Sequence, residues 1–416
     1  MKVIIKNIAE LVQVEDKIQE KVSGAAMKNL ATIKDAFLSL EDGIITDFGS
    51  MNDWAGIDDW NNTEVIDAEG GMVFPTWIDS HSHLVFGGTR EGEFVDRING
   101  LTYEEIANRG GGILNSAQKL ADATEDELYE SASARLIELI KMGTGALEIK
   151  SGYGLSTESE LKMLRVIKRL KENFPITIKS TFLGAHALPL AYKDNKEGYL
   201  KLIEEEMLPK VAEEGLAEYV DIFCEKGYFS VADMERVVNV GKKYGLIPKV
   251  HVNQFNIIGG VPSAVKLGAL SVDHLEVVNQ EDIDALKDSS TMPTLLPSCS
   301  FFLKIPYGPA RVMMDQGLPV CLATDYNPGS TPSGNMNFVV SLACIHMNMN
   351  PEEAINAATI NGAYAMGISK SEGSIAKGKK GNIFITKKIP SYAFLPYNFG
   401  HNIIEKVFIN GNEFSR

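Results

Sequence analysis

The chain has 416 residues, of which 44% are hydrophobic, and it carries a net charge of -15. This length exceeds that of an ordinary single domain and suits one large α/β barrel with a small appended module. The acidic balance argues against a nucleic-acid partner, which would require a basic surface. No run of about 18 apolar residues is present, so no membrane span is expected.

The two signals that bear on location are the N-terminus and the cysteines. Residues 1–7 contain no long apolar stretch and no small-residue cleavage site, which argues against a signal peptide. The four cysteines have irregular spacing and form no CxxC pair: Cys224, Cys299, Cys321 and Cys344. This spacing argues against a disulfide framework or a structural zinc site and favours a reducing compartment. We therefore expect a cytoplasmic protein.

Both ends of the chain are rich in short predicted strands separated by turns. In the first 70 residues, apolar runs alternate with a turn and a polar loop, at residues 3–5, 11–12, 36–38, 41–43 and 52–62. The last part repeats this pattern at residues 377–382, 383–385, 407–409 and 410–412. We therefore expect residues 1–70 and 371–416 to form together one small β-sandwich module.

The middle of the chain, residues 71–370, repeats a short apolar run, a polar residue, a loop and a helix. Eight such runs occur, at residues 71–74, 145–149, 176–178, 219–223, 247–250, 269–272, 292–296 and 320–323. Helix starts are indicated between them by the capping-box pair Thr124 and Glu127 and by Asn350 followed by Pro351. Eight strands that alternate with helices predict a (β/α)8 TIM-like barrel, whose chemistry lies at the C-terminal strand ends.

Histidines and one aspartate follow these strand ends. The first run leads into His81-Ser82-His83, and side chains alternate in an extended segment, so both imidazoles point the same way. The fifth run ends at His251, the sixth at His274 and the eighth at Asp325. Five of the seven histidines closely follow apolar runs: His81, His83, His186, His251 and His274. Structural core histidines would not be expected to gather on one rim of a barrel.

Three imidazoles and one carboxylate form a ligand set for a metal ion: His81, His83, His251 and Asp325. This set suits Zn2+ or Fe2+, with a water completing the coordination shell. A metal held in this way lowers the pKa of its water to about 7, so hydroxide is available at neutral pH. Asp325 can then also take the proton of the water and pass it to a leaving nitrogen.

The order HxH, His, His, Asp across a (β/α)8 barrel with a flanking β module resembles the amidohydrolase superfamily. In that superfamily a bridging lysine carbamate would be expected at the end of the fourth strand. This chain has Phe223-Cys224-Glu225 there, which favours one metal over two. Many relatives carry Pro-Gly before the HxH strand end, whereas this chain has Pro75-Thr76-Trp77, a departure that concerns backbone geometry more than chemistry.

Within the superfamily, the chain resembles the imidazolonepropionase family. Similar segments span nearly the whole chain, at residues 83–94, 110–113, 150–155, 181–187, 221–225, 273–276 and 323–329. The most diagnostic are Lys-Ser-Gly-Tyr-Gly at 150–154 and Phe-Leu-Gly-Ala-His at 182–186. The resemblance implies hydrolysis of the cyclic amide of 4-imidazolone-5-propanoate to N-formimidoyl-L-glutamate in histidine degradation. It also implies a homodimer.

The resemblance further implies roles for individual residues. Arg90 matches the substrate-binding arginine of the family and can hold the propionate through two parallel hydrogen bonds. Such a local cation is needed because the global charge repels an anionic substrate. The metal and His274 would stabilise the tetrahedral oxyanion, and the ring nitrogen would leave with the proton of Asp325. The remaining expected substrate contacts are Tyr153, His186, Gln254, Asn327, Gly329 and Ser330.

Two alternatives remain open at this point. The first is an amidohydrolase-type heterocycle deaminase or another cyclic-amide hydrolase. Such deaminases commonly carry His-x-x-Glu on the fifth strand, whereas this chain has His251-Val252-Asn253-Gln254. Because an amide cannot titrate, Gln254 is assigned to orienting the ring. The second alternative is a non-catalytic scaffold barrel, which would be expected to have lost metal ligands that this chain retains.

Overall fold

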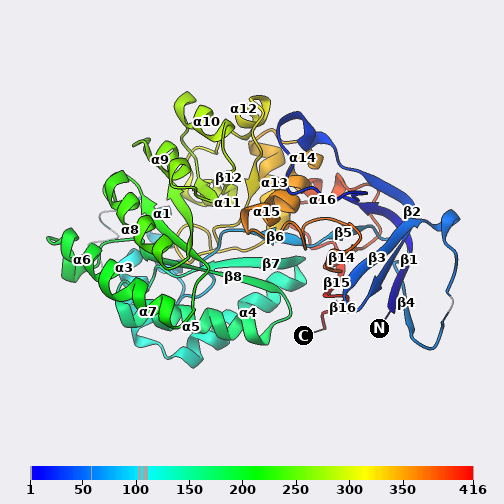
Figure 1. Cartoon of the computed structure of the whole chain (residues 1–416), viewed down its shortest axis with the longest axis horizontal. Helices are drawn as coiled ribbons and strands as arrows, with labels where there is room; N and C mark the ends of the chain where they lie inside the picture. The colour runs from blue at the N-terminus through cyan, green and yellow to red at the C-terminus, as the bar shows by residue number, and fades with distance from the viewer. Residues whose placement is uncertain (1, 58, 102–104, 106–110, 416) are drawn as a thin grey trace.

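The computed structural model describes residues 2–57, 59–101, 105 and 111–415. It contains two eight-stranded sheets, one of them parallel and wrapped by helices (Figure 1). The second sheet lies at the right of Figure 1 and carries both chain ends. Gly110, in one of the segments that resemble the imidazolonepropionases, lies outside the described residues. No helix in the described part of the chain is long and apolar enough to cross a membrane.

The parallel sheet runs in strict chain order, so each strand pairs with its predecessor. Its strands are β6 (Trp77–Asp79), β7 (Thr144–Lys150), β8 (Thr177–Ala185), β9 (Tyr219–Cys224), β10 (Ile247–Val252), β11 (Ser271–His274), β12 (Met292–Leu295) and β13 (Cys321–Leu322). Its two edges meet just beyond β6 and β13, where Ser82 bridges Tyr326. There His83 N donates to Tyr326 O at 2.8 Å, and Asp325 N donates to His81 O at 2.9 Å. The predicted barrel is confirmed, and the segments that close it carry predicted metal ligands.

The first barrel strand differs from the prediction. The pattern assigns the apolar run 71–74 to it, but β5 (Val73–Pro75) pairs antiparallel with β14 (Ile383–Thr386) in the second sheet. The chain then enters β6 across Thr76, whose N–H donates to Asn382 O at 3.0 Å. Two short apolar runs separated by one residue read as a single strand in the sequence, because periodicity does not report which sheet each run joins.

The second sheet joins the two ends of the chain, as predicted. Its order is β16-β15-β14-β5-β1-β2-β3, and β4 pairs with β1. Its other strands are β1 (Lys2–Val12), β2 (Thr32–Glu41), β3 (Ile44–Ser50), β4 (Thr63–Asp67), β15 (Ile404–Ile409) and β16 (Asn412–Glu413). A separate apolar cluster from both termini, which includes Ile5, Leu38, Ile383 and Phe408, covers this sheet.

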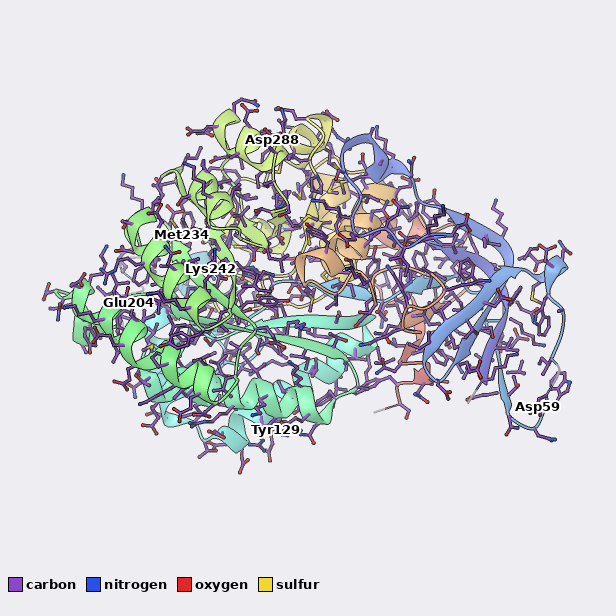
Figure 2. All side chains as sticks on the ribbon, in the orientation of Figure 1. Asp59, Tyr129, Glu204, Met234, Lys242 and Asp288 are labelled. Carbon is purple, nitrogen blue, oxygen red and sulfur yellow. The ribbon has the colours of Figure 1, made fainter. Side chains whose placement is uncertain are left out.

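Helices form the outer layer of the barrel. They are α1 (Glu91–Ile98), α3 (Ile113–Asp122), α4 (Glu125–Lys141), α5 (Thr157–Asn173), α6 (Lys196–Leu202), α7 (Leu208–Glu213), α8 (Val231–Lys243), α9 (Gly260–Lys266), α10 (Gln280–Lys287), α11 (Pro297–Leu303), α12 (Ala310–Asp315), α13 (Met336–His346), α14 (Pro351–Ala358) and α15 (Ile360–Ala365). A further helix, α16 (Phe394–Tyr397), lies between β14 and β15 in the chain and packs on α13. A π-helical segment, Ile203–Met207, joins α6 to α7. Figure 2 shows Tyr129 and Glu204 in this peripheral layer.

The predicted helix starts are confirmed. Before α4, Thr124 Oγ1 accepts from Glu127 N at 3.2 Å, and Glu127 Oε2 accepts from Thr124 N at 2.8 Å. Before α14, Asn350 is the N-cap residue and Pro351 occupies the first turn. These short-range signals satisfy backbone N–H groups that have no partner inside the helix.

A capping box that the pattern did not predict begins α8. Ser230 Oγ accepts from Asp233 N at 3.2 Å, and Asp233 Oδ2 accepts from Ser230 N at 2.8 Å. We expect Ser230→Ala to lower the free energy of unfolding by about 1 kcal/mol, and Ser230→Gly by only about 0.3 kcal/mol, because glycine is tolerated at an N-cap. Urea denaturation followed by circular dichroism measures both. Equal losses in the two variants would contradict the capping role.

Candidate active site

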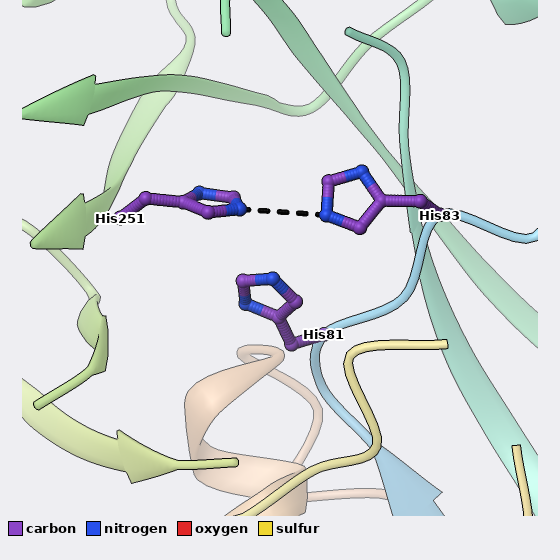
Figure 3. A group of neighbouring side chains, drawn as sticks. All are labelled: His81, His83 and His251. Atoms are coloured by element: carbon purple, nitrogen blue, oxygen red, sulfur yellow. Dashed lines mark hydrogen bonds between the residues drawn. The ribbon is translucent and has the colours of Figure 1, made fainter. Parts of the chain in front are cut away.

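Three imidazoles converge at the C-terminal end of the barrel strands (Figure 3), and the carboxylate of Asp325 lies beside them. His81, His83 and His251 are at most 2% exposed. The Nε2 atoms of His83 and His251 lie 3.4 Å apart. Asp325 Oδ1 lies 3.6 Å from His81 Nε2 and 3.5 Å from His83 Nε2. The structure therefore brings together the four residues that the sequence assigns to a metal.

The donor atoms of this cluster fit a divalent cation. His81 Nδ1 lies 2.7 Å from Asp273 Oδ2, and His251 Nδ1 lies 2.8 Å from Asp221 Oδ2. Because an ionised carboxylate only accepts, each Nδ1 carries the proton and each Nε2 presents a lone pair. His81 Nε2 is buried and has no hydrogen-bond partner among the described residues. Lone pairs that face one another in a buried site are satisfied by a cation, and carboxylate-backed imidazoles are typical of metal ligands.

Burial keeps the three imidazoles neutral, which is the protonation state that binds metal. It lowers the pKa of His81 and that of His83 well below the usual histidine value. It lowers the pKa of His251 to about 3, although the Asp221 carboxylate opposes this shift. Burial raises the pKa of Asp325 to about 6, against the opposing effect of His274.

His274 stands beside this cluster, with one ring nitrogen within 4.8 Å of donor atoms of His81 and Asp325. Its Nδ1 lies 3.2 Å from Glu276 Oε1. Burial alone would lower the pKa of His274, but the Glu276 carboxylate outweighs it and the pKa rises to about 9. Glu276 was not among the predicted site residues, although it follows His274 at a spacing of two in the sequence.

Backbone strain coincides with these side chains. The φ angle is 91° at His274 and 57° at Asp325, in the left-handed region that favours glycine. Each such conformation costs about 1–3 kcal/mol and persists where the surrounding structure enforces it, often at functional sites. His274 ends β11 and Asp325 lies three residues after β13, so the strained backbone occurs where the barrel strands present site residues.

A pocket leads from solvent to the ligand cluster. Its outer cavity measures about 410 Å³, which is in the range of small-molecule sites. An inner cavity of about 50 Å³ is lined by His83, His251, His274 and Asp325. Both cavities share six lining residues: Tyr153, His186, Phe223, Gln254, Asn327 and Ser330. The outer cavity adds Arg90 and Gly329, so every predicted substrate contact lines this pocket.

His186 is held in one tautomer. Its Nδ1 lies 3.0 Å from Gly152 O, and a carbonyl only accepts, so Nδ1 carries the proton. Burial lowers the pKa of His186 to about 4, which leaves Nε2 as an acceptor at neutral pH. Gly152 has a φ of 105°, and a Cβ there would lie 2.9 Å from His186 Nδ1, so this position requires glycine. The imidazole also stacks on His83, with ring centroids 5.3 Å apart.

Arg90 reaches the outer cavity already paired with Glu93. Arg90 Nε and Nη2 lie 2.9 Å and 2.6 Å from Glu93 Oε2, and Glu93 Oε1 accepts from Gly112 N at 2.9 Å. A Cβ at Gly329 would collide with Arg90 Nη1, so glycine makes room for the guanidinium. Arg97 Nη2 donates to Gly329 O at 3.2 Å. Glu93 and Arg97 were not predicted as site residues; their spacing from Arg90 along α1 is the available signal.

The loop after β13 is organised by Asn327. Its Oδ1 accepts from Gly329 N and from Ser330 N, each at 2.8 Å, and its Nδ2 donates to Asp325 O at 2.7 Å. Ser330 Oγ donates to Asp325 Oδ2 at 3.1 Å. The backbone amides of Gly329 and Ser330, two of the expected substrate contacts, therefore donate within the loop. These bonds orient the Asp325 carboxylate.

The remaining predicted contacts line the pocket wall. The Tyr153 ring lies 5.7 Å from that of His83 and 5.4 Å from that of His186, in edge-on geometry. Gln254 Nε2 donates to Cys299 Sγ at 3.4 Å, which directs its amide plane. Tyr153, His186 and Gln254 thus surround the space between Arg90 and the ligand cluster.

Solved structures share this fold at low sequence identity. Guanine deaminase of E. coli superposes with a TM-score of 0.75 at 13% identity and covers 100% of this chain and 99% of its own. A triazine hydrolase variant superposes with a TM-score of 0.77 at 15% identity, over 99% of this chain and 94% of its own. At such identities the likeness shows the fold alone.

Sequence relatives are much closer. The amidohydrolase family model matches residues 72–414. An imidazolonepropionase of Flavobacterium johnsoniae is 62% identical over 408 residues, which cover 98% of each chain. An imidazolonepropionase of Clostridium tetani is 46% identical and covers 99% of this chain and 97% of its own. Similarity of this extent, over both the barrel and the terminal sheet, shows that the chain belongs to the imidazolonepropionase family of the amidohydrolases.

Proposed function

We propose that the chain hydrolyses the ring amide of 4-imidazolone-5-propanoate to N-formimidoyl-L-glutamate, a step of histidine degradation. The observation that carries this proposal is one pocket with a guanidinium at its outer end and a cluster of metal-ligating side chains at its inner end. A small cyclic amide with a carboxylate tail matches this arrangement, because its carboxylate can meet the guanidinium while its amide ring reaches the metal-ligating side chains. Full-length relatives of this name support the assignment.

The outer end of the pocket selects the charge of the substrate. Arg90, Glu93 and Arg97 together carry one excess positive charge, which matches a single carboxylate. This local charge overcomes the repulsion expected from a net charge of -15. Glu93 accepts from Nε and from one N–H of Nη2 of Arg90. The N–H groups of Nη1 and the second N–H of Nη2 therefore remain as donors for the propionate. The amide ring then extends inward past Tyr153.

One divalent ion, Zn2+ or Fe2+, is assigned to the inner end. Three imidazole nitrogens and one carboxylate oxygen suit either ion. The ligands would be His81, His83, His251 and Asp325. Bound there, the ion supplies Lewis acidity and an activated water.

Asp325 and His274 are assigned to the chemical step. The Ser330 hydroxyl holds Asp325 Oδ2, so this carboxylate is oriented to take the proton of the attacking water and deliver it to the ring nitrogen as the amide bond breaks. His274, held by Glu276, faces the same space and donates to the carbonyl oxygen as it gains negative charge.

His186 and Gln254 are assigned to holding the ring. His186 Nε2 can accept from a ring N–H, because its other nitrogen carries the proton. The sequence leaves two roles open for His186, to polarise the carbonyl or to hold the ring, and this tautomer favours the second. Gln254, whose amide is directed by Cys299, contacts the ring edge without transferring protons.

We also propose a cytoplasmic homodimer. The four cysteines are free, which suits a reducing compartment. The dimer rests on family resemblance, and light scattering of the purified protein would test it directly.

The activity itself is tested with freshly prepared imidazolone propionate and metal-replete protein. Loss of the ultraviolet absorbance of the ring, with mass-spectrometric detection of N-formimidoyl-glutamate, is expected. A chelator should abolish turnover, and added Zn2+ or Fe2+ should restore it. Absence of turnover by metal-loaded protein would contradict the proposed function and leave the fold unaffected.

Replacement of Arg90 should separate substrate binding from metal binding. We expect Arg90→Ala to raise KM about 10- to 100-fold, because charge-assisted hydrogen bonds of about 1.5–3 kcal/mol are lost. Metal content should not change. Arg165→Ala, which removes the exposed ion pair with Glu214, is the matched control and should keep the wild-type KM. An unchanged KM in Arg90→Ala would remove this residue from the carboxylate subsite.

Replacement of His274 should separate the chemical step from metal binding. We expect His274→Ala to retain the metal, because its imidazole lies outside the assigned ligand set, and to lower kcat about 100- to 1000-fold through loss of oxyanion stabilisation. Elemental analysis and steady-state kinetics measure the two effects. Metal loss in this variant would instead identify His274 as a ligand.

A further inference from the structure

Lys150 is a fully buried ammonium group next to the proposed metal centre. It is 0% exposed and ends β7. Its Nζ donates to Glu148 Oε1 at 2.6 Å and to Asp221 Oδ2 at 2.9 Å, and it lies 3.6 Å from Asp273 Oδ2. The mechanism proposed above uses none of these contacts. A buried charge with three carboxylate neighbours therefore needs a physical account.

The two aspartates that contact Lys150 are those that hold two of the imidazoles. Asp221 Oδ2 contacts both Lys150 Nζ and His251 Nδ1, at 2.9 Å and 2.8 Å. Asp273 Oδ2 lies 2.7 Å from His81 Nδ1 and 3.6 Å from the same Nζ. One ammonium therefore reaches, on each aspartate, the oxygen atom that orients an imidazole.

The far oxygens of both carboxylates are also held. Asp221 Oδ1 accepts from Ile222 N at 2.7 Å and from His251 N at 3.0 Å. Asp273 Oδ1 accepts from Ser271 Oγ at 2.6 Å. Both oxygens of each carboxylate thus have partners that fix the carboxylate plane, and Lys150 is the partner that Asp221 and Asp273 have in common.

Charge explains why a cation is required at this point. Glu148, Asp221 and Asp273 are each 0% exposed, and unpaired buried carboxylates would repel one another. Burial alone would lower the pKa of Lys150, but Asp221, Glu148 and Asp273 outweigh it and raise the pKa, so the group stays charged. An ammonium without a lone pair cannot itself be a ligand.

The network extends to the backbone of the ligand segment. Glu148 also pairs with Lys249, which is likewise buried. Lys249 Nζ donates to Ser80 O at 2.9 Å, immediately before His81. The charges around Lys150 therefore connect to both the side chain and the main chain of one proposed ligand.

We infer that Lys150 is a positioning residue of the metal centre: by fixing Asp221 and Asp273 relative to one another, it sets the directions of His251 and His81 and thereby the affinity for the metal. This inference rests on the metal site in the proposed function. It assigns Lys150 no contact with substrate and no proton transfer.

The test is the affinity of metal-stripped protein for Zn2+, measured by competition with a chromophoric chelator. We expect Lys150→Met to bind Zn2+ about 10-fold more weakly, the low end of the effect of removing a partner of a metal ligand. The Co2+-substituted variant should show a changed visible absorption spectrum, because two imidazoles lose their fixed direction. Lys150→Gln, which keeps an amide donor, gives the same measurement if Lys150→Met does not fold.

Lys379→Met is the matched control. Lys379 is also 0% exposed, but its Nζ donates to Glu372 O at 3.1 Å and to Ser374 Oγ at 2.6 Å, away from the ligands. This variant should keep the wild-type Zn2+ affinity. Affinity of the Lys150 variant within threefold of wild type, or an equal loss in the Lys379 variant, would overturn the inference.

A double variant tests the route of the effect. With Asp221→Asn in place, adding Lys150→Met should weaken Zn2+ binding by clearly less than the about 10-fold loss expected in the wild-type background, because the contact with Asp221 is already removed and only that with Asp273 is left to lose. If the losses of Zn2+ affinity in the two single variants multiply in the double variant, the inference is overturned. Turnover and Zn2+ binding of the wild-type protein are measured in parallel. If the wild-type protein binds Zn2+ but shows no turnover, the proposed reaction alone is contradicted. If the wild-type protein turns over normally and the Lys150 variants keep its Zn2+ affinity, the positioning role of Lys150 alone is contradicted.

Discussion

The structure depends on the hydrogen bonds that close the barrel between the segments after β6 and β13. Asp325 N donates to His81 O, and His83 N donates to Tyr326 O, so the first and last strands are joined through residues proposed as metal ligands. About 240 residues separate these segments in the chain, yet closure places their side chains within contact distance. Closure of the barrel therefore also brings the proposed metal ligands together, and the strained backbone at Asp325 lies at this junction.

Closure alone would leave the imidazoles free to rotate, and buried charges restrict them. The interior of such barrels is usually filled with branched apolar side chains. Here Glu148, Lys150 and Lys249 occupy interior positions instead. Removing one partner from such a buried network is strongly destabilising, because it leaves a buried charge without a counter-charge. In this barrel the network orients side chains, since Asp221 and Asp273 connect it to two imidazoles.

The outer end of the pocket resolves a conflict between global and local charge. The acidic protein places guanidinium groups at the outer end of the pocket, where an ion pair and a glycine hold them in position for the proposed anionic substrate. Glu93 fixes the Arg90 fork, and Gly329 leaves the space that the guanidinium occupies. Preorganisation of this kind limits the entropy lost when substrate binds. The same loop carries Asp325, so the carboxylate proposed to transfer protons and the glycine that makes room for Arg90 share one structural element.

By itself, the sequence determined the barrel, the pairing of both termini in one module and the set of candidate ligands. These follow from signals within a few residues, such as apolar runs, the Thr124 capping box and the HxH alternation. Only the tertiary structure decided that residues 73–75 belong to the second sheet, that Glu93 holds Arg90 and that Lys150 joins Asp221 to Asp273. The physical reason is that these contacts depend on how strands pair and on how side chains are oriented in the folded chain. Local periodicity carries no information about which partners folding brings together.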